Sequence, residues 1–118
     1  MKAVGDMIHN ASMKFGIYSS AGTKTCQGLP GGLGHEVEDA ADYASWGVDL
    51  LKYDNCYNAG VPAQERYFTM YEALKATGRS IFYAVCNWGN ERVTEWAPSF
   101  ANSWRTTQDI EIYSSTSN

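Results

Sequence analysis

The sequence predicts a parallel α/β fold, and within that class about four central βα units of a (β/α)8 barrel. The first observation is that helical and strand-like apolar patterns alternate along the chain of 118 residues. The second is that strand starts lie roughly 25–35 residues apart, close to the length of one βα unit. The third is that the pattern begins with a helix and ends just after a strand, whereas an independent domain usually begins with a strand. We therefore expect residues 1–118 to form the central segment of a larger barrel, which takes about 250 residues.

The first half of the chain contains two predicted helices, two predicted strands and a long loop. Their expected bounds are a helix over 2–12, a strand over Met13–Ser20, a loop over Ala21–Gly34, a helix over His35–Trp46 and a strand over Asp49–Cys56. The first helix places Val4 and Met7 on an apolar stripe, and Gly47 ends the second helix. Both strands are short apolar runs without a helical period, which suits burial on both faces of a parallel sheet. The loop is far longer than a typical βα connection of about 2–6 residues, and such loops tend to be functional.

The second half of the chain repeats this alternation. Its expected segments are a helix over Pro62–Gly78, a strand over Ser80–Trp88, a short helix over Glu91–Ala97 and a strand over Ser103–Asp109. Proline is tolerated at the first helical position and glycine favours a helix end, which sets the bounds of the longer helix. The last strand is the weakest of the four because most of its residues are polar. Four strands also suit a small doubly wound sheet, which is the alternative fold.

The composition is that of a folded globular chain, with 44% hydrophobic residues, 19% charged residues and a net charge of −4. The few basic residues are scattered, which argues against a nucleic-acid-binding surface. No apolar run approaches the roughly 20 residues of a membrane-spanning helix, and the first residues lack the apolar region of a signal peptide. The three cysteines allow at most one internal bridge and lack the close pairs of a zinc site. We therefore expect no nucleic acid or membrane partner and no metal site.

Two acidic residues, Asp54 and Asp109, stand at the ends of predicted strands. Ligands of α/β folds bind at the carboxyl ends of parallel strands. A pair of carboxyl groups in such a place is typical of enzymes that hydrolyse glycosides. Lys52 shares a strand face with Asp54, so its ammonium would help to keep that carboxyl ionised. Arg105 lies four residues before Asp109. Both Arg105 and Lys52 could bind sugar hydroxyls. The structural alternatives are a turn cap at Asp54, an ion pair between Lys52 and Asp54, and a surface pair between Arg105 and Asp109.

Aromatic residues accompany these strand ends, and histidines do not. Trp88, Tyr18 and Tyr53 lie at or near the ends of predicted strands, where a sugar face could stack on a ring. The alternative for each is a place in the core, and Tyr53 points away from the site if Asp54 points into it. The two histidines have no partner acid at a useful spacing, so the sequence does not support a Ser/His/Asp triad.

Several of these stretches together resemble one enzyme family. The matching stretches are Lys14–Gly22, Lys24–Cys26, Pro30–Gly34, Trp46–Cys56, Cys86–Gly89 and Trp104–Ile110. In this order they closely resemble the α-galactosidase/α-N-acetylgalactosaminidase family, the melibiases of glycoside hydrolase family 27. The resemblance implies a (β/α)8 barrel that hydrolyses terminal α-linked galactose with retention, by double displacement, without a metal or cofactor.

The resemblance also assigns roles at the carboxyl edge of the sheet. It implies that Asp54 is the nucleophile and Asp109 the acid/base, with carboxyl groups about 5–5.5 Å apart in an intact retaining site. The residues that match galactose-contacting positions are Tyr18, Lys52 and Arg105. Trp88 and Asn87 are further candidates for substrate binding, and Asn87 stands where the family reads the sugar 2-substituent. An asparagine can bond a hydroxyl, so galactose is expected, with N-acetylgalactosamine as the alternative.

The same resemblance implies a disulfide and a free thiol among the three cysteines. Cys26 and Cys56 match a family disulfide that joins two barrel loops beside the sugar pocket, and Cys86 is expected to be a free thiol. A disulfide suits a secreted, lysosomal or vacuolar protein. The family's early strands, its final strands and its C-terminal β-sandwich have no counterpart in the sequence.

These missing counterparts leave three further expectations. The isolated chain is expected to hydrolyse galactosides feebly or not at all, because an open half-barrel exposes sheet edges and apolar faces. A homo-oligomer, in which a second copy covers these surfaces, is one way to complete the fold. The rival interpretations are an inactive truncated or degenerate product that at most binds a sugar or a partner, and a small independent binding domain.

Overall fold

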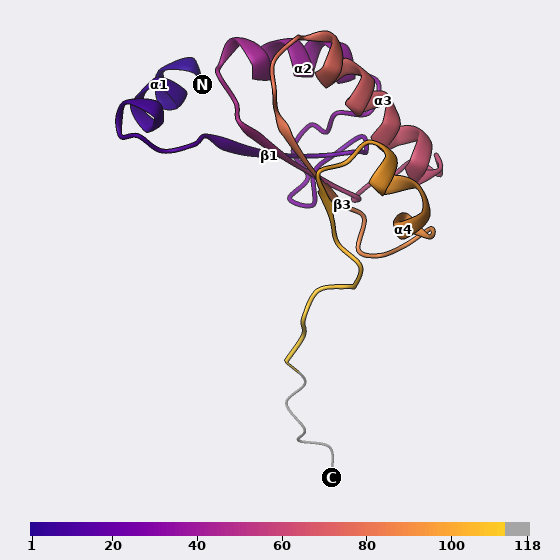
Figure 1. Cartoon of the computed structure of the whole chain (residues 1–118). Coiled ribbons are helices and arrows are strands. Elements are labelled where there is room, and N and C mark those ends of the chain that lie inside the picture. The colour runs from indigo at the N-terminus through magenta and orange to yellow at the C-terminus, as the bar shows by residue number, and fades with distance from the viewer. Residues whose placement is uncertain (113–118) are drawn as a thin grey trace.

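The computed structural model describes residues 1–112 and shows a four-stranded parallel sheet in the order β1-β2-β3-β4 (Figure 1). Its elements are α1 Lys2–Asn10, β1 Gly16–Ser20, α2 Glu36–Ser45, β2 Leu50–Asp54, α3 Ala63–Ala76, β3 Phe82–Cys86, α4 Val93–Trp96, the 3₁₀ helix η1 Ala97–Ser99 and β4 Ser103–Trp104. Each strand pairs in parallel with the next one along the chain. The predicted α/β alternation is confirmed, and the fold is a segment of a (β/α)8 barrel.

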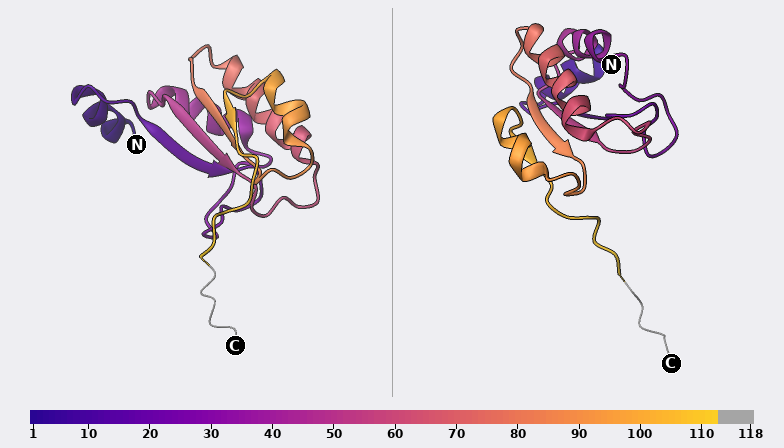
Figure 2. Two further views of the ribbon diagram at one scale, coloured as in Figure 1. Left: turned by 60° about the horizontal axis from the view of Figure 1, so that its bottom comes forward. Right: turned by 90° about the vertical axis from the view of Figure 1, so that its right-hand side faces the viewer.

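The core lies between the sheet and the helices α2, α3 and α4, which gather on one face of it (Figures 1 and 2). Successive strand residues point to opposite faces, so alternate positions enter this core. The principal core residues are Leu51, Tyr53, Tyr83 and Val85 from the strands and Tyr67, Met70 and Leu74 from α3. Tyr53 packs edge-on against Tyr67 with ring centroids 5.8 Å apart, so it is a core residue that points away from Asp54.

The opposite face of the sheet is open within residues 1–112. Tyr18 is 43% exposed and Phe82 44% exposed, and Lys52 of the central strand is also exposed. The prediction that the strands are buried on both faces is therefore wrong for the described residues. In a closed barrel the inward face is filled by side chains of the other strands, which lie outside this segment. Residues 1–112 contain no helix with the length and apolar character needed to cross a membrane.

Helix α1 lies beyond the start of β1, apart from the other helices (Figure 1). The predicted apolar stripe does not dock it, because Val4 is 45% exposed and Met7 71% exposed. Instead Gly5 is buried, and a Cβ there would lie 2.5 Å from the carbonyl oxygen of Trp46 and 2.9 Å from the ring of Phe15. Helix α1 therefore approaches the sheet through its smallest residue, a contact that apolar periodicity does not reveal.

Asp49 joins three segments at the amino end of β2. Its Oδ2 accepts a hydrogen bond from the backbone N–H of Phe15 at 2.8 Å and lies 2.7 Å from Nε2 of His9. Its Oδ1 accepts a hydrogen bond from Nη2 of Arg79 at 2.9 Å. The Phe15 hydrogen bond, followed by the interactions with His9 and Arg79, lowers the pKa of Asp49. This cluster connects α1, β1 and the approach to β3 on the side of the sheet away from Asp54.

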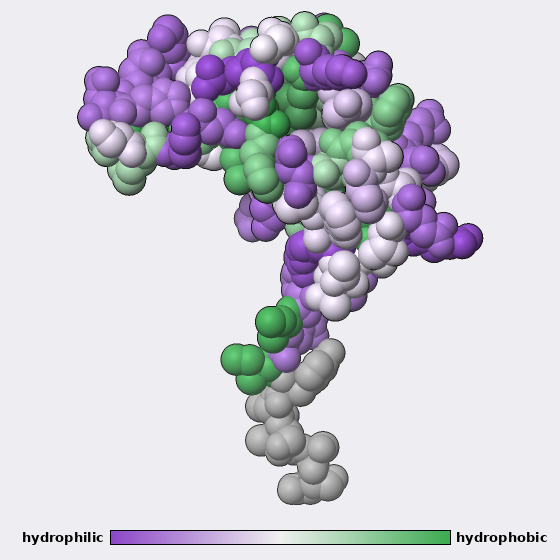
Figure 3. All heavy atoms as spheres, in the orientation of Figure 1, coloured by the Kyte–Doolittle hydropathy of each residue, from purple (hydrophilic) through white to green (hydrophobic). Residues whose placement is uncertain are grey.

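The last strand is shorter than predicted. Strand β4 contains only Ser103–Trp104, although the backbone N–H of Arg105 still donates to Val85 at 3.1 Å. The Arg105 guanidinium then bonds the carbonyl of Thr107 at 3.0 Å and the carboxylate of Asp109, which curls this segment away from β3. Green, apolar atoms stand out on the extended tail below the body of the protein (Figure 3), where Ile110 is 97% exposed and Ile112 is 96% exposed.

Candidate active site

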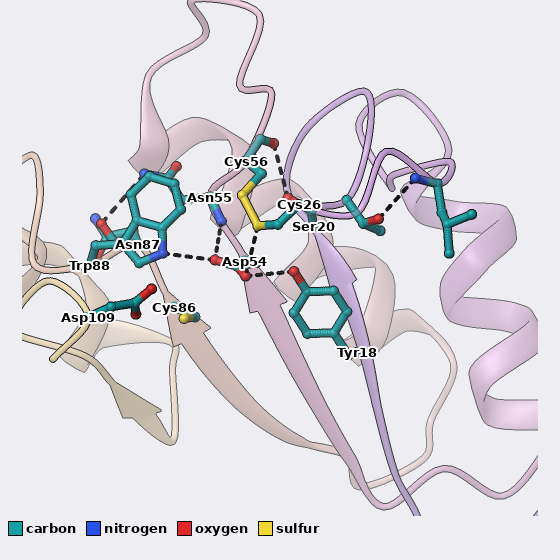
Figure 4. Close-up of a disulfide and its surroundings, with 12 residues drawn as sticks. Tyr18, Ser20, Cys26, Asp54, Asn55, Cys56, Cys86, Asn87, Trp88 and Asp109 are labelled. Atoms are coloured by element: carbon teal, nitrogen blue, oxygen red, sulfur yellow. Dashed lines mark hydrogen bonds between the residues drawn. A yellow bond between two sulfur atoms is a disulfide. The ribbon is translucent and has the colours of Figure 1, made fainter. Parts of the chain in front are cut away.

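The centre of the site is Asp54, the last residue of β2, which is 8% exposed. Its Oδ2 accepts a hydrogen bond from the hydroxyl of Tyr18 at 2.6 Å (Figure 4). Its Oδ1 accepts two more, from the backbone N–H of Asn55 at 2.9 Å and from Nε1 of Trp88 at 3.0 Å. A carboxylate oxygen accepts hydrogen bonds, so the three donors hold the Asp54 side chain in one orientation. The catalytic role of Asp54 stays a prediction.

Tyr18 and Lys52 occupy the open face of the sheet beside Asp54. They are register partners on β1 and β2, and Nζ of Lys52 lies 5.9 Å from the centroid of the Tyr18 ring. Burial, followed by the hydrogen bond to Asp54, raises the pKa of Tyr18 to about 12, so its hydroxyl remains a donor at neutral pH. No ion pair joins Lys52 to Asp54 among the described residues, so the alternative of a structural ion pair is not found there, and the expected action of Lys52 on Asp54 stays a prediction. Residues two apart on a strand are separated by about 7 Å, and the Lys52 ammonium extends toward the aromatic ring instead.

The disulfide between Cys26 and Cys56 confirms the predicted pairing and joins the loops that follow β1 and β2. Sγ of Cys26 lies 3.2 Å from Oδ2 of Asp54 (Figure 4). A sulfur in a disulfide carries no proton, so this is a close contact and not a donated hydrogen bond. Ser20 adds a second link, because its hydroxyl donates to the carbonyl of Cys56 at 3.0 Å.

The close grouping of Cys26, Asp54 and Cys56 has the spacing of a metal site, but its chemistry does not suit one. Metals bind cysteine as the thiolate, and both of these sulfurs are oxidised in the disulfide. Cys86 is the remaining cysteine, and it is free and buried, as predicted. Burial raises the pKa of the Cys86 thiol, which makes it a poor nucleophile.

The loop after β3 places Trp88 over Asp54 and Asn87 behind it (Figure 4). Trp88 has a φ of 62°, a left-handed conformation that costs about 1–3 kcal/mol and is concentrated at functional sites. Asn87 is fully buried, and its Nδ2 donates to the carbonyl of Asn90 at 2.6 Å, while its Oδ1 has no hydrogen-bond partner within residues 1–112. A role for Asn87 in reading the sugar stays a prediction.

Asp109 lies in the curled segment after β4, on the same side of the sheet as Asp54 (Figure 4). Its side chain is 75% exposed and forms an ion pair with Arg105, whose Nη1 donates to Oδ1 at 2.7 Å. The Arg105 pKa is raised mainly by this hydrogen bond. Gln108 ties the segment to the β3 loop, because its Nε2 donates to Oδ1 of Asn90 at 3.0 Å. The structure thus brings Asp109 to the expected edge, and its catalytic role stays a prediction.

A hollow of about 470 Å³ lies beside this group of residues. It is lined by the disulfide, Asn55, Trp88 and the loop residues Tyr57–Gly60. A larger hollow of about 620 Å³ lies around Lys14, Arg79 and Phe100, at the opposite end of the strands. Because ligands of parallel α/β sheets bind at the carboxyl end of the strands, the smaller hollow has the location expected for a ligand. A third hollow, of about 520 Å³, is lined in part by Tyr18.

Sequence reasoning missed Arg66, a buried arginine of α3 that donates hydrogen bonds to the loops after β1 and β2 at this edge. It also missed the hydrogen bond from the Asn55 backbone to Asp54. A signal for Arg66 existed, since it precedes Met70 by four residues and so lies on the apolar face of its helix. A charged residue on such a face must have polar partners in the core.

A buried carboxylate at the carboxyl edge of parallel strands, with a second acid on the same side, is the arrangement of a barrel glycosidase. The chain belongs to the alpha galactosidase A family (Melibiase_2), whose sequence profile matches residues 1–117. It is 56% identical over 110 residues to alpha-galactosidase 3 of Arabidopsis thaliana, covering 93% of this chain and 25% of that protein.

Solved structures agree with this assignment. The chain superposes on alpha-galactosidase I of Mortierella vinacea with a TM-score of 0.90 at 48% identity, covering 93% of this chain and 29% of that one. It superposes on a Saccharomyces cerevisiae alpha-galactosidase with raffinose with a TM-score of 0.85 at 50% identity, covering 88% and 24% respectively. The chain therefore spans less than a third of the length of these relatives.

Proposed function

We propose that the protein containing this chain is an α-galactosidase, which removes terminal α-linked galactose from galactosides with retention. The observation that carries the proposal is the buried Asp54 carboxylate, held by Tyr18, Asn55 and Trp88 at the carboxyl edge of the sheet. The relatives named above support the activity, and the yeast relative with raffinose supports a galactoside as the substrate. In the whole protein this chain would supply the central units of the catalytic barrel.

In the first half of the reaction, one Asp54 oxygen attacks the anomeric carbon of galactose while the bond to the leaving oxygen breaks. Asp109 donates a proton to that oxygen, and the sugar stays covalently attached to Asp54. The donors on Asp54 orient the attacking carboxylate, and Arg105 orients Asp109. Tyr18 and Lys52 would contact the sugar from the open face of the sheet.

In the second half, Asp109 accepts a proton from water, whose oxygen attacks the anomeric carbon and releases Asp54. Two inversions give net retention, and both proton transfers are made by the Asp109 carboxyl group. The exposed position of Asp109 allows exchange of protons with solvent between turnovers. The disulfide beside Asp54 supports a secreted or vacuolar location.

The test is a chimera in which this chain replaces the matching segment of the Arabidopsis alpha-galactosidase 3. We expect the chimera to hydrolyse an aryl α-galactoside and to release galactose first as the α-anomer, observed by NMR. The Asp54→Asn chimera should lose roughly 10⁴-fold or more in kcat, because the covalent step needs the carboxylate. A folded chimera without turnover, or an active Asp54→Asn chimera, would refute the proposal.

A further inference from the structure

Arg66 is a fully buried cation in a part of α3 that the proposed chemistry does not use. Its side chain has no exposed surface, and burial lowers its pKa. A buried guanidinium destabilises the fold unless its N–H groups are hydrogen-bonded. The partners of Arg66 therefore indicate which segments it holds in place. Arg66 lies in the first turn of α3, which follows the loop that leaves Asp54.

The Arg66 guanidinium donates hydrogen bonds to two loops and forms an ion pair with a third. Its Nε donates to the carbonyl of Val61 at 2.7 Å and its Nη1 to the carbonyl of Ala21 at 2.6 Å. Its Nη2 donates to Oδ1 of Asn55 at 2.8 Å and lies 3.8 Å from Oε2 of Glu91. These residues belong to the loops after β1, β2 and β3. Because the guanidinium is a rigid planar fork, it fixes the loops relative to one another.

Each of these loops also brings a group to Asp54. The β2 loop supplies the backbone N–H of Asn55, and the β3 loop supplies Nε1 of Trp88. The β1 loop begins at Ala21, whose N–H donates to the Asp54 carbonyl at 2.7 Å, and leads to Cys26. Nδ2 of Asn55 also approaches the carbonyl of Asn87 at 3.5 Å, immediately before Trp88.

We infer that Arg66 is a positioning residue for Asp54. By holding Asn55 and the β3 loop, the guanidinium keeps two N–H donors on Oδ1 and thereby sets the orientation of the carboxylate. The catalytic meaning of this inference rests on the proposed nucleophile role of Asp54. The arrangement of the donors can be measured whether or not the chain hydrolyses a sugar.

The first measurement is the indole N–H signal of Trp88 in the full chain, by ¹H–¹⁵N NMR. The chain has four tryptophans, and loss of one signal in a Trp88→Phe variant assigns this one. In Arg66→Met we expect the Trp88 indole proton to exchange with solvent about tenfold faster or more, because its hydrogen bond opens more often. An unchanged shift and exchange rate in Arg66→Met would overturn the inference.

The matched control is Tyr83→Phe. It removes a buried hydrogen bond of the same helix, from the Tyr83 hydroxyl to the carbonyl of Tyr67 at 2.8 Å, without touching the loops. We expect it to lower the unfolding midpoint and to leave the Trp88 signal in place. If Arg66→Met does not fold, Asn55→Ala decides the question, because it removes one acceptor and keeps the guanidinium. An unchanged Trp88 signal in Asn55→Ala would then contradict the inference.

The second measurement is hydrolysis of the aryl α-galactoside by the chimera that carries the same substitutions. Active molecules are counted with a fluorinated galactoside that leaves the nucleophile covalently blocked. Per active molecule, we expect Arg66→Met to lower kcat by roughly 10- to 100-fold with little change in KM, since misplaced catalytic groups slow the chemical step. Arg66→Met combined with Asn55→Ala should cost little more than Arg66→Met alone.

The kinetic outcomes separate the two proposals. A variant with fewer active molecules but an unchanged kcat for each would show that Arg66 only stabilises the fold, which would overturn the inference. Absence of hydrolysis by the unmodified chain and by the chimera would refute the proposed function instead. In that case the Trp88 signal still decides whether Arg66 positions the donors on Asp54.

Discussion

Removal of the disulfide by the change of Cys26 and Cys56 to serine should destabilise the chain by a predictable amount. The two cysteines are 30 residues apart in sequence. The loop-closure relation gives an entropy difference of about 12 cal/mol/K for such a loop, or about 3.6 kcal/mol at 25 °C. This is a large part of the roughly 5–15 kcal/mol by which a small domain is stable.

The assay is urea unfolding of the oxidised chain, the reduced chain and the double serine variant, monitored by tryptophan fluorescence. We expect the reduced chain and the variant to lose similar free energies of unfolding, because both lose the same constraint on the unfolded state. Adding reductant to the variant is the control, since Cys86 is its only thiol and is already free. A loss below about 1 kcal/mol would refute the loop-entropy reasoning.

Two further predictions test the site and the amino end of the sheet. Tyr18→Phe removes the 2.6 Å hydrogen bond to Asp54, and we expect kcat/KM of the chimera to fall roughly 10- to 100-fold, the value of a hydrogen bond to a charged group; an unchanged kcat/KM would exclude a role for this hydroxyl. At the opposite end of the sheet, hydrogen bonds lower the pKa of Asp49 in the folded protein. The ionised Asp49 therefore stabilises the fold above its pKa in the unfolded chain, about 3.9, and this stabilisation is lost as the pH falls through its lower pKa in the folded chain. Urea unfolding should therefore show a deficit for Asp49→Asn at pH 7 that shrinks below pH 4, and an equal deficit at both pH values would contradict the assignment.

The local pattern of the sequence predicted much of the fold and the centre of the site. The helices and strands follow one another in the predicted order. The prediction used apolar periodicity, together with the helix start at Pro62 and the helix ends at Gly47 and Gly78. The position of Asp54 at the end of an apolar run placed it at the ligand-binding edge, because ligands of parallel α/β sheets bind at the carboxyl ends of the strands. These features depend on residues close together in the chain.

Other features were decided only by the tertiary structure. Lys52 shares a face with Asp54 as alternation requires, yet its ammonium lies over the Tyr18 ring. Helix α1 packs through Gly5 and leaves its apolar stripe exposed. Only a residue without a side chain allows this close approach of the helix backbone to its neighbours, and apolar periodicity does not reveal such a contact. The strand after Ser103 stops early because Arg105 binds its own segment.

The sequence by itself thus determined the order of the elements, the strand-end position of Asp54 and, through family resemblance, the pairing of Cys26 with Cys56. Only the tertiary structure decided which donors surround Asp54 and where Arg66 lies among the loops. The physical reason is that helix and strand formation follow from local periodicity. The partners of a buried charge, in contrast, come from loops distant in sequence, whose meeting depends on the packing of the whole sheet.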